Sequence, residues 1–174
     1  MTYDSNCSQC PYLNQKHLNK NQQTVRPVVP IGLEDNGSNV LLVFQAPGDV
    51  EWVKGLAIQP TQKVGGSAGR RIELSWGRTN QKRTNFDIIN TVQCFPGNNN
   101  NRDLEPNVMA ICSCSKRLNS ILIKKQYNKI ITFGEIANEV VLVILQNITN
   151  NKPIIIKSKH PNGGVSQQEL DKLW

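Results

Sequence analysis

The chain of 174 residues contains no long apolar segment. A membrane-spanning helix needs roughly 20 predominantly apolar residues in a row, and no stretch of this sequence approaches that length. The first four residues, MTYD, also lack the basic and apolar regions of a secretory signal peptide. We therefore expect a cytoplasmic protein without a membrane partner.

Acidic residues are in short supply. The chain has 13 Asp and Glu against 20 Lys and Arg, which gives a formal net charge of +7 and an isoelectric point near 9.3. This imbalance predicts attraction to a polyanion such as nucleic acid, with an affinity that falls as the salt concentration rises. A chain of this length can bury about two-thirds of its unfolded surface in one core. We expect a single domain over residues 1–174 and a monomer.

The chain has five cysteines, an odd number for a protein in a reducing compartment. Such a set favours metal ligands or reactive thiols over disulfides, and it fits four ligands with one cysteine to spare. They are a CxxC pair, one Cys just past a predicted strand and two on a predicted helix: Cys7, Cys10, Cys94, Cys112 and Cys114. This spacing is typical of a zinc or an iron–sulfur site. Because Cys112 and Cys114 project about 200° apart, only one of them can face the centre.

A metal centre would also explain how the N-terminal arm is held. Residues 1–38 are polar and show little apolar periodicity, so a hydrophobic core alone does not fix them. We expect the centre to tie this arm to the domain.

Four short apolar runs alternate with helical patterns along the rest of the chain. An unbroken run of Val, Ile and Leu is typical of a strand covered on both faces, as in a parallel sheet. The pattern predicts an α/β protein, a three-layer α/β/α fold with a four-stranded parallel central sheet. The expected strands are 40–44, 86–92, 129–133 and 153–158; the expected helices are 70–76, 105–126, 135–147 and a short closing helix that buries Leu170, Leu173 and Trp174. Residues 98–101, an Asn run, are expected to form a solvated loop.

Polar clusters follow three of the four predicted strands, at residues 45–51, 90–94 and 160–162. In open α/β sheets, ligands bind at the carboxyl ends of the strands. We therefore expect these clusters to form one site.

The same clusters carry a family resemblance. Residues 45–51 (QAPGDVE) resemble the Gly-Glu-Ala-Pro-Gly-x-x-Glu motif of the iron–sulfur, family 4-like uracil-DNA glycosylases, with Phe44 and Gln45 in place of the first Gly and Glu. Residues 90–96 (NTVQCFP) are similar to that family's Asn-Val-Val-Lys-Cys-Arg-Pro motif, and 160–162 (HPN) to its His-Pro-Ser. The resemblance covers about residues 7–164. It implies a DNA glycosylase, a hydrolase that flips out a base and cleaves its N-glycosidic bond to leave an abasic site.

That chemistry needs few groups. A carboxylate must steady the sugar cation or position water, a donor must take up negative charge on the departing base, and polar groups must read the base edge. The resemblance implies catalytic roles for Gln45, Asp49, Glu51, Asn90 and His160, with Asn90 as the base reader and His160 as the donor. Ala46 stands where some branches of the superfamily carry a catalytic Asp, so we take Asp49 as the candidate for positioning water. The residues expected to contact substrate are Ala46, Pro47, Gly48, Ile58, Val64, Asn162 and Gly163.

The resemblance also implies a four-iron four-sulfur cluster, held by Cys7, Cys10, Cys94 and one helical cysteine. Counting back from Leu118 and Gly134 selects Cys114, and counting forward from Arg102 and Pro106 selects Cys112; we favour Cys114. Zinc is the alternative, because spacing alone does not separate the metals.

The identity of the base follows from one altered segment. In the resembling family, the Phe of a Gly-x-Pro-Phe-Val-Gly segment stacks on uracil, and here that position falls on Ile58 or on Val64 according to the direction of counting. Without an aromatic ring there, we expect a wider pocket. The amide of Asn90 can present either donor–acceptor order, so it suits cytosine as well as uracil. We expect a bulky modified pyrimidine as substrate, such as glucosylated hydroxymethylcytosine in phage DNA, and hence a role in antiviral defence.

Two other functions stay open: an ordinary uracil-DNA glycosylase of base-excision repair, and a nucleic-acid binding module that has lost catalysis. In each case DNA is the expected partner. Basic residues after the glycine-rich turn would face it, or would form only a solvated helix face: Arg70, Arg71, Arg78, Lys82 and Arg83.

Overall fold

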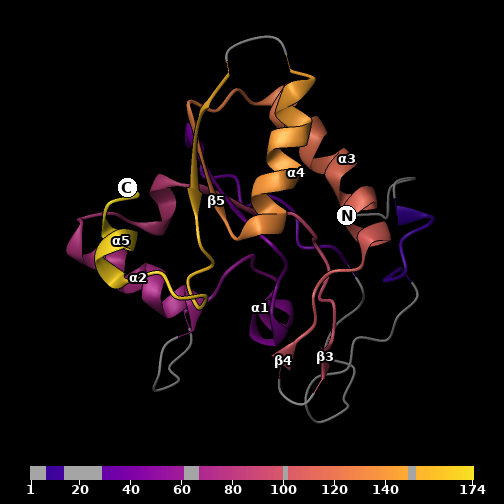
Figure 1. Ribbon diagram of the computed structural model, residues 1–174, viewed down its shortest axis with the longest axis horizontal. Coiled ribbons are helices and arrows are strands. Elements are labelled where there is room, and N and C mark those ends of the chain that lie inside the picture. The colour runs from indigo at the N-terminus through magenta and orange to yellow at the C-terminus, as the bar shows by residue number, and fades with distance from the viewer. Residues whose placement is uncertain (1–6, 14–28, 61–66, 100–101, 149–151) are drawn as a thin grey trace.

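A four-stranded parallel sheet with the strand order β2-β1-β5-β6 forms the centre of the molecule (Figure 1). The computed structural model describes residues 7–13, 29–60, 67–99, 102–148 and 152–174. Helices flank both faces of the sheet, so the predicted three-layer α/β/α fold is confirmed. The strands are β1 Val40–Phe44, β2 Asp87–Asn90, β5 Lys129–Phe133 and β6 Ile154–Ser158.

The alternation of side chains along β1 divides the core into two layers. Leu42 and Phe44 pack toward one helical layer, and Leu41 and Val43 pack toward the other. The first layer contains α1 Asp49–Lys54, α2 Ala68–Arg78 and α5 Gln167–Asp171, and the second contains α3 Val108–Lys124 and α4 Glu135–Gln146.

A helix that the sequence did not predict follows β1. Residues 49–54 form helix α1, which buries Trp52 and ends at Gly55, a residue with a left-handed φ of 71°. A helix of six residues is too short to show a helical period in the sequence. Because α1 follows β1 so closely, its first turn lies at the carboxyl end of the sheet.

The start of the Asn run is a strand rather than a solvated loop. Residues 98–101 were expected to form a solvated loop, but β3 Asn98–Asn99 pairs antiparallel with β4 Arg102–Asp103. Figure 1 shows this hairpin beside α1. The hairpin matters because it carries Asp103 to the carboxyl end of β1.

A short 3-10 turn, η2 Arg83–Asn85, precedes β2.

The closing helix packs as predicted. Leu170 and Leu173 are buried, and the Trp174 ring lies 5.8 Å from Trp76 and 5.2 Å from Phe86 between centroids. The Trp174 indole also donates a hydrogen bond of 2.7 Å to Ser75 Oγ. These contacts fix α5 against α2.

The described parts of the N-terminal arm pack against the domain. Cys7, Cys10 and Tyr12 belong to the same buried cluster as the core residues of α1 and α2. Farther along, Ile31 donates from its backbone to Gln93 O at 2.7 Å. Among the helices that the structure describes, none combines the length and the hydrophobicity required to span a membrane.

Candidate functional site

A cavity of about 400 Å³ opens at the carboxyl ends of β1 and β6, and we call it the strand-end cavity. Its size falls within the range of about 300–1,000 Å³ typical of small-molecule sites. It is lined by residues 44–51, 57–58, 67–68, 96, 103–105, 160 and 162. Nine expected site residues line it: Gln45, Ala46, Pro47, Gly48, Asp49, Glu51, Ile58, His160 and Asn162. Val64 lies outside the described residues.

His160 is fixed in one tautomer by its own turn. The backbone N–H of Asn162 donates to His160 Nδ1 at 3.3 Å, so that nitrogen is an acceptor and the proton of the neutral ring lies on Nε2. Burial lowers the pKa of His160 below its ordinary value of 6.5. The cavity wall therefore carries a neutral imidazole that can donate a hydrogen bond from Nε2 at neutral pH.

Gln45 lies next to His160 across Gly134. A Cβ added to Gly134 would lie 3.8 Å from His160 Cβ and 3.9 Å from Gln45 Oε1. Gly134 follows β5 and has a φ of 93°, which favours glycine. Three neighbouring strand ends, those of β1, β5 and β6, thus bring an amide and an imidazole to one wall of the cavity.

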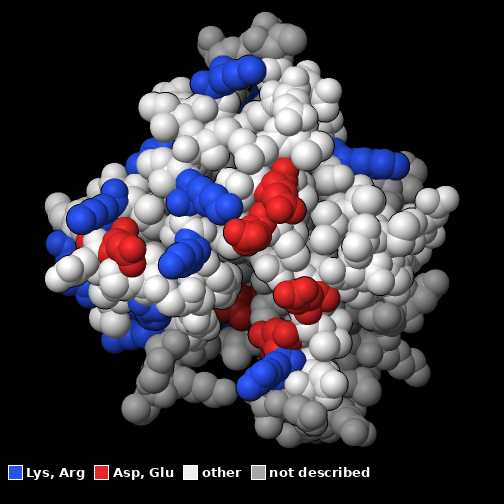
Figure 2. All heavy atoms as spheres, viewed as in Figure 1, with Lys and Arg blue, Asp and Glu red and all other residues white. Residues whose placement is uncertain are grey.

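Two carboxylates lie against Gly48 in another part of the cavity wall. A Cβ on Gly48 would lie 2.8 Å from Glu51 Oε2 and 2.9 Å from Asp103 Oδ2. Burial raises the pKa of Glu51, the negative charge of Asp103 raises it further, and a 3.1 Å hydrogen bond from Gln59 N–H opposes these effects. Figure 2 shows acidic side chains gathered around a hollow over α1 and β4. This wall can stabilise a cation or accept a proton from water.

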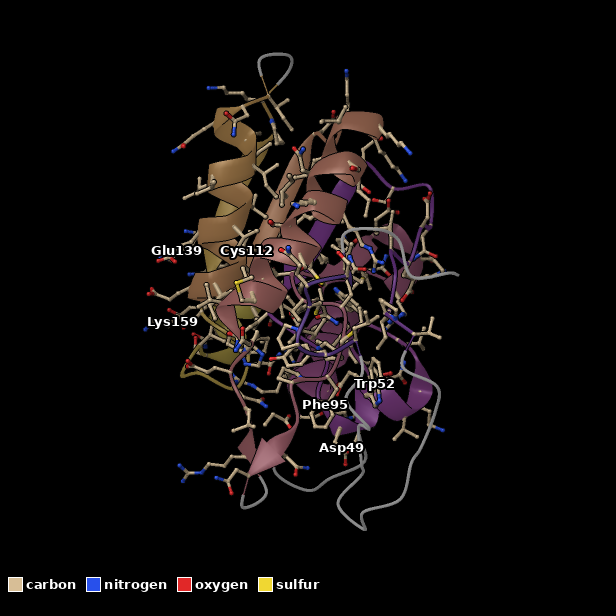
Figure 3. All side chains as sticks on the ribbon, turned by 90° about the vertical axis from the view of Figure 1, so that its right-hand side faces the viewer. Asp49, Trp52, Phe95, Cys112, Glu139 and Lys159 are labelled. Carbon is tan, nitrogen blue, oxygen red and sulfur yellow. The ribbon has the colours of Figure 1, made fainter. Side chains whose placement is uncertain are left out.

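Sequence reasoning missed Asp103. The residue follows the Asn run and no motif marks it, and it reaches the cavity only because β3 and β4 pair. Asp49, the expected water-positioning acid, also lines the cavity, in the first turn of α1 (Figure 3). Its Oδ1 is buried without a hydrogen-bond partner among the described residues. Three acids of the lining could therefore position water: Asp49, Glu51 and Asp103.

Asn90 does not lie on the cavity wall. Its side chain is fully buried, and its Nδ2 donates to Ala57 O at 3.1 Å. Its Oδ1 has no hydrogen-bond partner in the part of the chain that the structure describes. Because Ala57 lines the cavity, Asn90 must exchange this contact before it can read a base.

Gly163 also supports the site from outside the cavity. A Cβ there would lie 3.2 Å from His160 O, and its backbone N–H donates to that oxygen at 2.7 Å. A side chain at this position would therefore crowd the tight turn that carries His160.

One aromatic ring reaches the strand-end cavity. Phe44, the last residue of β1, lines it and stacks on Phe133 with centroids 4.5 Å apart. Phe44 was not predicted as a site residue, because its position in an apolar run is typical of a core residue of a strand. Ile58 lines the wall as expected.

Four of the five cysteines gather in one buried cluster: Cys7, Cys10, Cys94 and Cys114. Burial and the neighbouring cysteines raise the pKa of Cys94 and raise that of Cys114 to about 11. Cys112 is exposed on α3, well apart from Trp52 and Phe95 in Figure 3. The structure thus turns Cys114, the favoured candidate, toward the other three.

An arginine approaches this cysteine cluster. Arg117 donates from Nη2 to Cys7 Sγ at 3.0 Å and from Nη1 to Gln93 Oε1 at 3.3 Å. A cation beside sulfur stabilises thiolate over thiol. Four buried cysteines with such a donor fit an iron–sulfur cluster, whose thiolate ligands are spread over several iron atoms. Among the residues described, no three Cys, His, Asp or Glu side chains are placed to hold a single metal ion.

All four arginines expected to face DNA have partners within the protein. Three form ion pairs: Arg70 with Glu73 at 2.6 Å, Arg78 with Asp171 at 2.8 Å and Arg83 with Glu34 at 2.6 Å. Arg71 donates to backbone carbonyls of the His160 loop. In Figure 2, Lys and Arg side chains still gather over α2 and α5, beside the acidic hollow. The acidic partners Glu34, Glu73 and Asp171 therefore offset locally the positive charge of three of these arginines.

Comparison with protein-family models and with curated proteins gives no match to this chain.

Proposed function

We propose that this protein is a DNA glycosylase, which binds a flipped-out base in the strand-end cavity and hydrolyses its N-glycosidic bond to leave an abasic site. The observation that carries the proposal is a cavity whose lining holds two kinds of group: the neutral imidazole of His160 in one part of the wall, and the carboxylates of Glu51 and Asp103 in another. Bond breaking puts negative charge on the base and positive charge on the sugar, and these two kinds of group suit the two charges.

Each wall has a defined role in the reaction. The C1′–N bond breaks and its electron pair stays with the base, where the Nε2–H of His160 donates a hydrogen bond to the charged base. A water oxygen forms the new bond to C1′, and a carboxylate accepts one of its protons. We assign this acceptor role to Asp103, whose Oδ2 lies against Gly48 in the cavity lining. The proton then passes to the base, so that one water is consumed in each cycle.

The cysteine cluster has a structural role in this proposal. Cys7, Cys10, Cys94 and Cys114 would hold a four-iron four-sulfur cluster, which when bound joins the N-terminal segment to the domain core. A zinc ion is the alternative occupant. No reacting group of the strand-end cavity comes from this cluster.

The proposed substrate is a bulky modified pyrimidine in phage DNA, such as glucosylated hydroxymethylcytosine. The wall at Ile58 is aliphatic, and the acidic side chains around the mouth are acceptors for the hydroxyl groups of a sugar. Antiviral defence is the setting that this substrate implies.

A base panel tests the activity. Duplexes that contain uracil, hydroxymethylcytosine or its glucosylated form are incubated with excess enzyme, and abasic sites are detected by alkaline cleavage. We expect cleavage at the glucosylated base, and a rate about 10²–10³ lower for His160→Ala and for Asp103→Asn, the usual cost of losing a positioned polar group. Cleavage at uracil alone would establish the repair function instead.

A nucleic-acid binding module without catalysis is the competing function. The burial of Asn90 behind Ala57 favours it, since the expected base reader is not exposed. Tight DNA binding without an abasic product from any member of the panel would establish this alternative.

A further inference from the structure

The His160 loop is attached to α2 by one side chain. Arg71 donates from Nη1 to Pro161 O and from Nη2 to Val165 O, so its guanidinium bridges the two ends of the loop. Arg71 is half-buried and stands 90 positions before Pro161 in the sequence. In return, Gln167 Nε2 donates to Arg71 O at 2.8 Å. Each of the two segments, α2 and the one that carries His160, therefore donates hydrogen bonds to the other.

One peptide unit connects Arg71 to the imidazole. The carbonyl that receives Nη1 belongs to Pro161, and the N–H that donates to His160 Nδ1 belongs to Asn162. These two groups are the ends of the same planar trans peptide, in which the C=O and the N–H point in opposite directions. A guanidinium that holds the carbonyl on one side therefore directs the N–H toward Nδ1 on the other.

The charge of Arg71 adds to this geometric effect. A cation that donates to a peptide carbonyl polarises the unit and strengthens its N–H as a donor. A stronger bond to Nδ1 favours the tautomer that keeps the proton on Nε2.

We propose that Arg71 is the positioning residue for His160, which acts through the Pro161–Asn162 peptide to fix both the place and the tautomer of the imidazole. The catalytic consequence rests on the proposed glycosylase function, whereas the effect on the tautomer does not. Lysine cannot replace arginine fully here, because its single ammonium lacks the fork that spans two carbonyls.

The histidine count makes a direct test simple. The chain has two histidines, so selective ¹⁵N labelling gives two imidazole signals, and His160→Ala identifies the one of interest. In the wild-type protein we expect a protonated Nε2 and a bare Nδ1 above the pKa of the ring. In Arg71→Ala we expect averaged tautomers, and in Arg71→Lys an intermediate spectrum.

Arg70→Ala is the matched control. Arg70 precedes Arg71 on α2 but is exposed and paired with Glu73, so its loss removes a neighbouring charge without touching the loop. The His160 signal should match that of the wild type. A wild-type spectrum in both Arg71 variants, each verified as folded by circular dichroism, would overturn the proposal.

Single-turnover kinetics on the cleaved member of the base panel test the consequence. We expect Arg71→Ala to lower the excision step by about 10-fold or more, since misplacement of a catalytic group by 1 Å can cost about 10², and the KM for DNA to change little. Arg71→Lys should recover part of the rate. An altered tautomer with an unchanged rate would overturn the catalytic half alone. A wild-type protein that excises no base would refute the glycosylase function, and the NMR result would still decide the role of Arg71.

Discussion

The acid–base properties of single side chains give the first prediction. Burial raises the pKa of Glu51 above its ordinary value of 4.5, so between the two pKa values the folded protein binds more protons than the unfolded chain. The free energy of unfolding therefore falls as the pH rises through that window. Glu51→Gln removes the charge and keeps an oxygen acceptor for Gln59 N–H. Thermal denaturation should show a higher Tm for this variant at pH 7, by a few degrees at most, and no difference near pH 4.

A charge-matched control separates burial from net charge. Glu139 is exposed on α4, far from the strand-end cavity, and Glu139→Gln should leave Tm unchanged at both pH values. A Tm of Glu51→Gln below that of the wild type at pH 7 would mean that the charged form of Glu51 stabilises the fold.

Not every site residue could be predicted from the sequence alone. Gln45, Glu51 and His160 follow apolar strands directly, and parallel strands end at one edge of a sheet, so their convergence was predictable. The role of Asp103 depends on a hairpin of two-residue strands, which leaves no periodic signal. The burial of Asn90 depends on where the chain returns after α1, and no local pattern determines that.

At the level of elements, replacing each of the two glycines of α2 by Ala should change the free energy of unfolding in opposite directions. A Cβ on Gly69 would lie 1.9 Å from Gln59 O, so Gly69→Ala forces the 59–60 segment off the helix, while Gly77 has nothing within 4 Å. We expect Gly69→Ala to lose about 1–3 kcal/mol or more through overpacking. Gly77→Ala should gain about 0.5–1 kcal/mol, because Ala is the better helix residue. Urea denaturation of both variants measures the difference.

The activity of Gly69→Ala gives an additional readout. Gln59 is a hydrogen-bond donor to Glu51, so the displacement also disturbs the carboxylate wall of the cavity. Equal stability of the two variants would show that the 59–60 segment does not pack on α2 in solution.

The strands were easier to predict than the short elements. The predicted bounds of β1 and β5 match the structure, because each strand is a compact run with a polar residue or glycine on either side. Asn39 and Gln45 flank β1, and Asn128 and Gly134 flank β5. By contrast, α1 and the β3–β4 hairpin are stabilised by contacts with the rest of the molecule rather than by local pattern.

At the scale of the whole molecule, the cysteine cluster predicts a dependence of stability on metal. Anaerobically purified protein should contain about four irons per chain with matching sulfide, as a four-iron cluster requires. Cys114→Ser should lose most of this iron, whereas Cys112→Ser, at an exposed position on the same helix, should keep it. Removal of the metal should also lower Tm, because metal binding contributes to the stability of the folded state. A colourless protein with one zinc would contradict the cluster.

The strand order also has a consequence for synthesis on the ribosome. Among the strands that the structure describes, β1 is made first, yet it lies inside the sheet and pairs with β2 and β5, and β6 is added last at the edge. The turn that carries His160 follows β6. Arg71 on α2, which donates to this turn, is synthesised 90 residues before Pro161. Pairing between distant segments is slow, because the loop must close before the contacts form. A nascent chain halted before residue 160 therefore lacks the imidazole wall, even though β1, β2 and β5 have already been made.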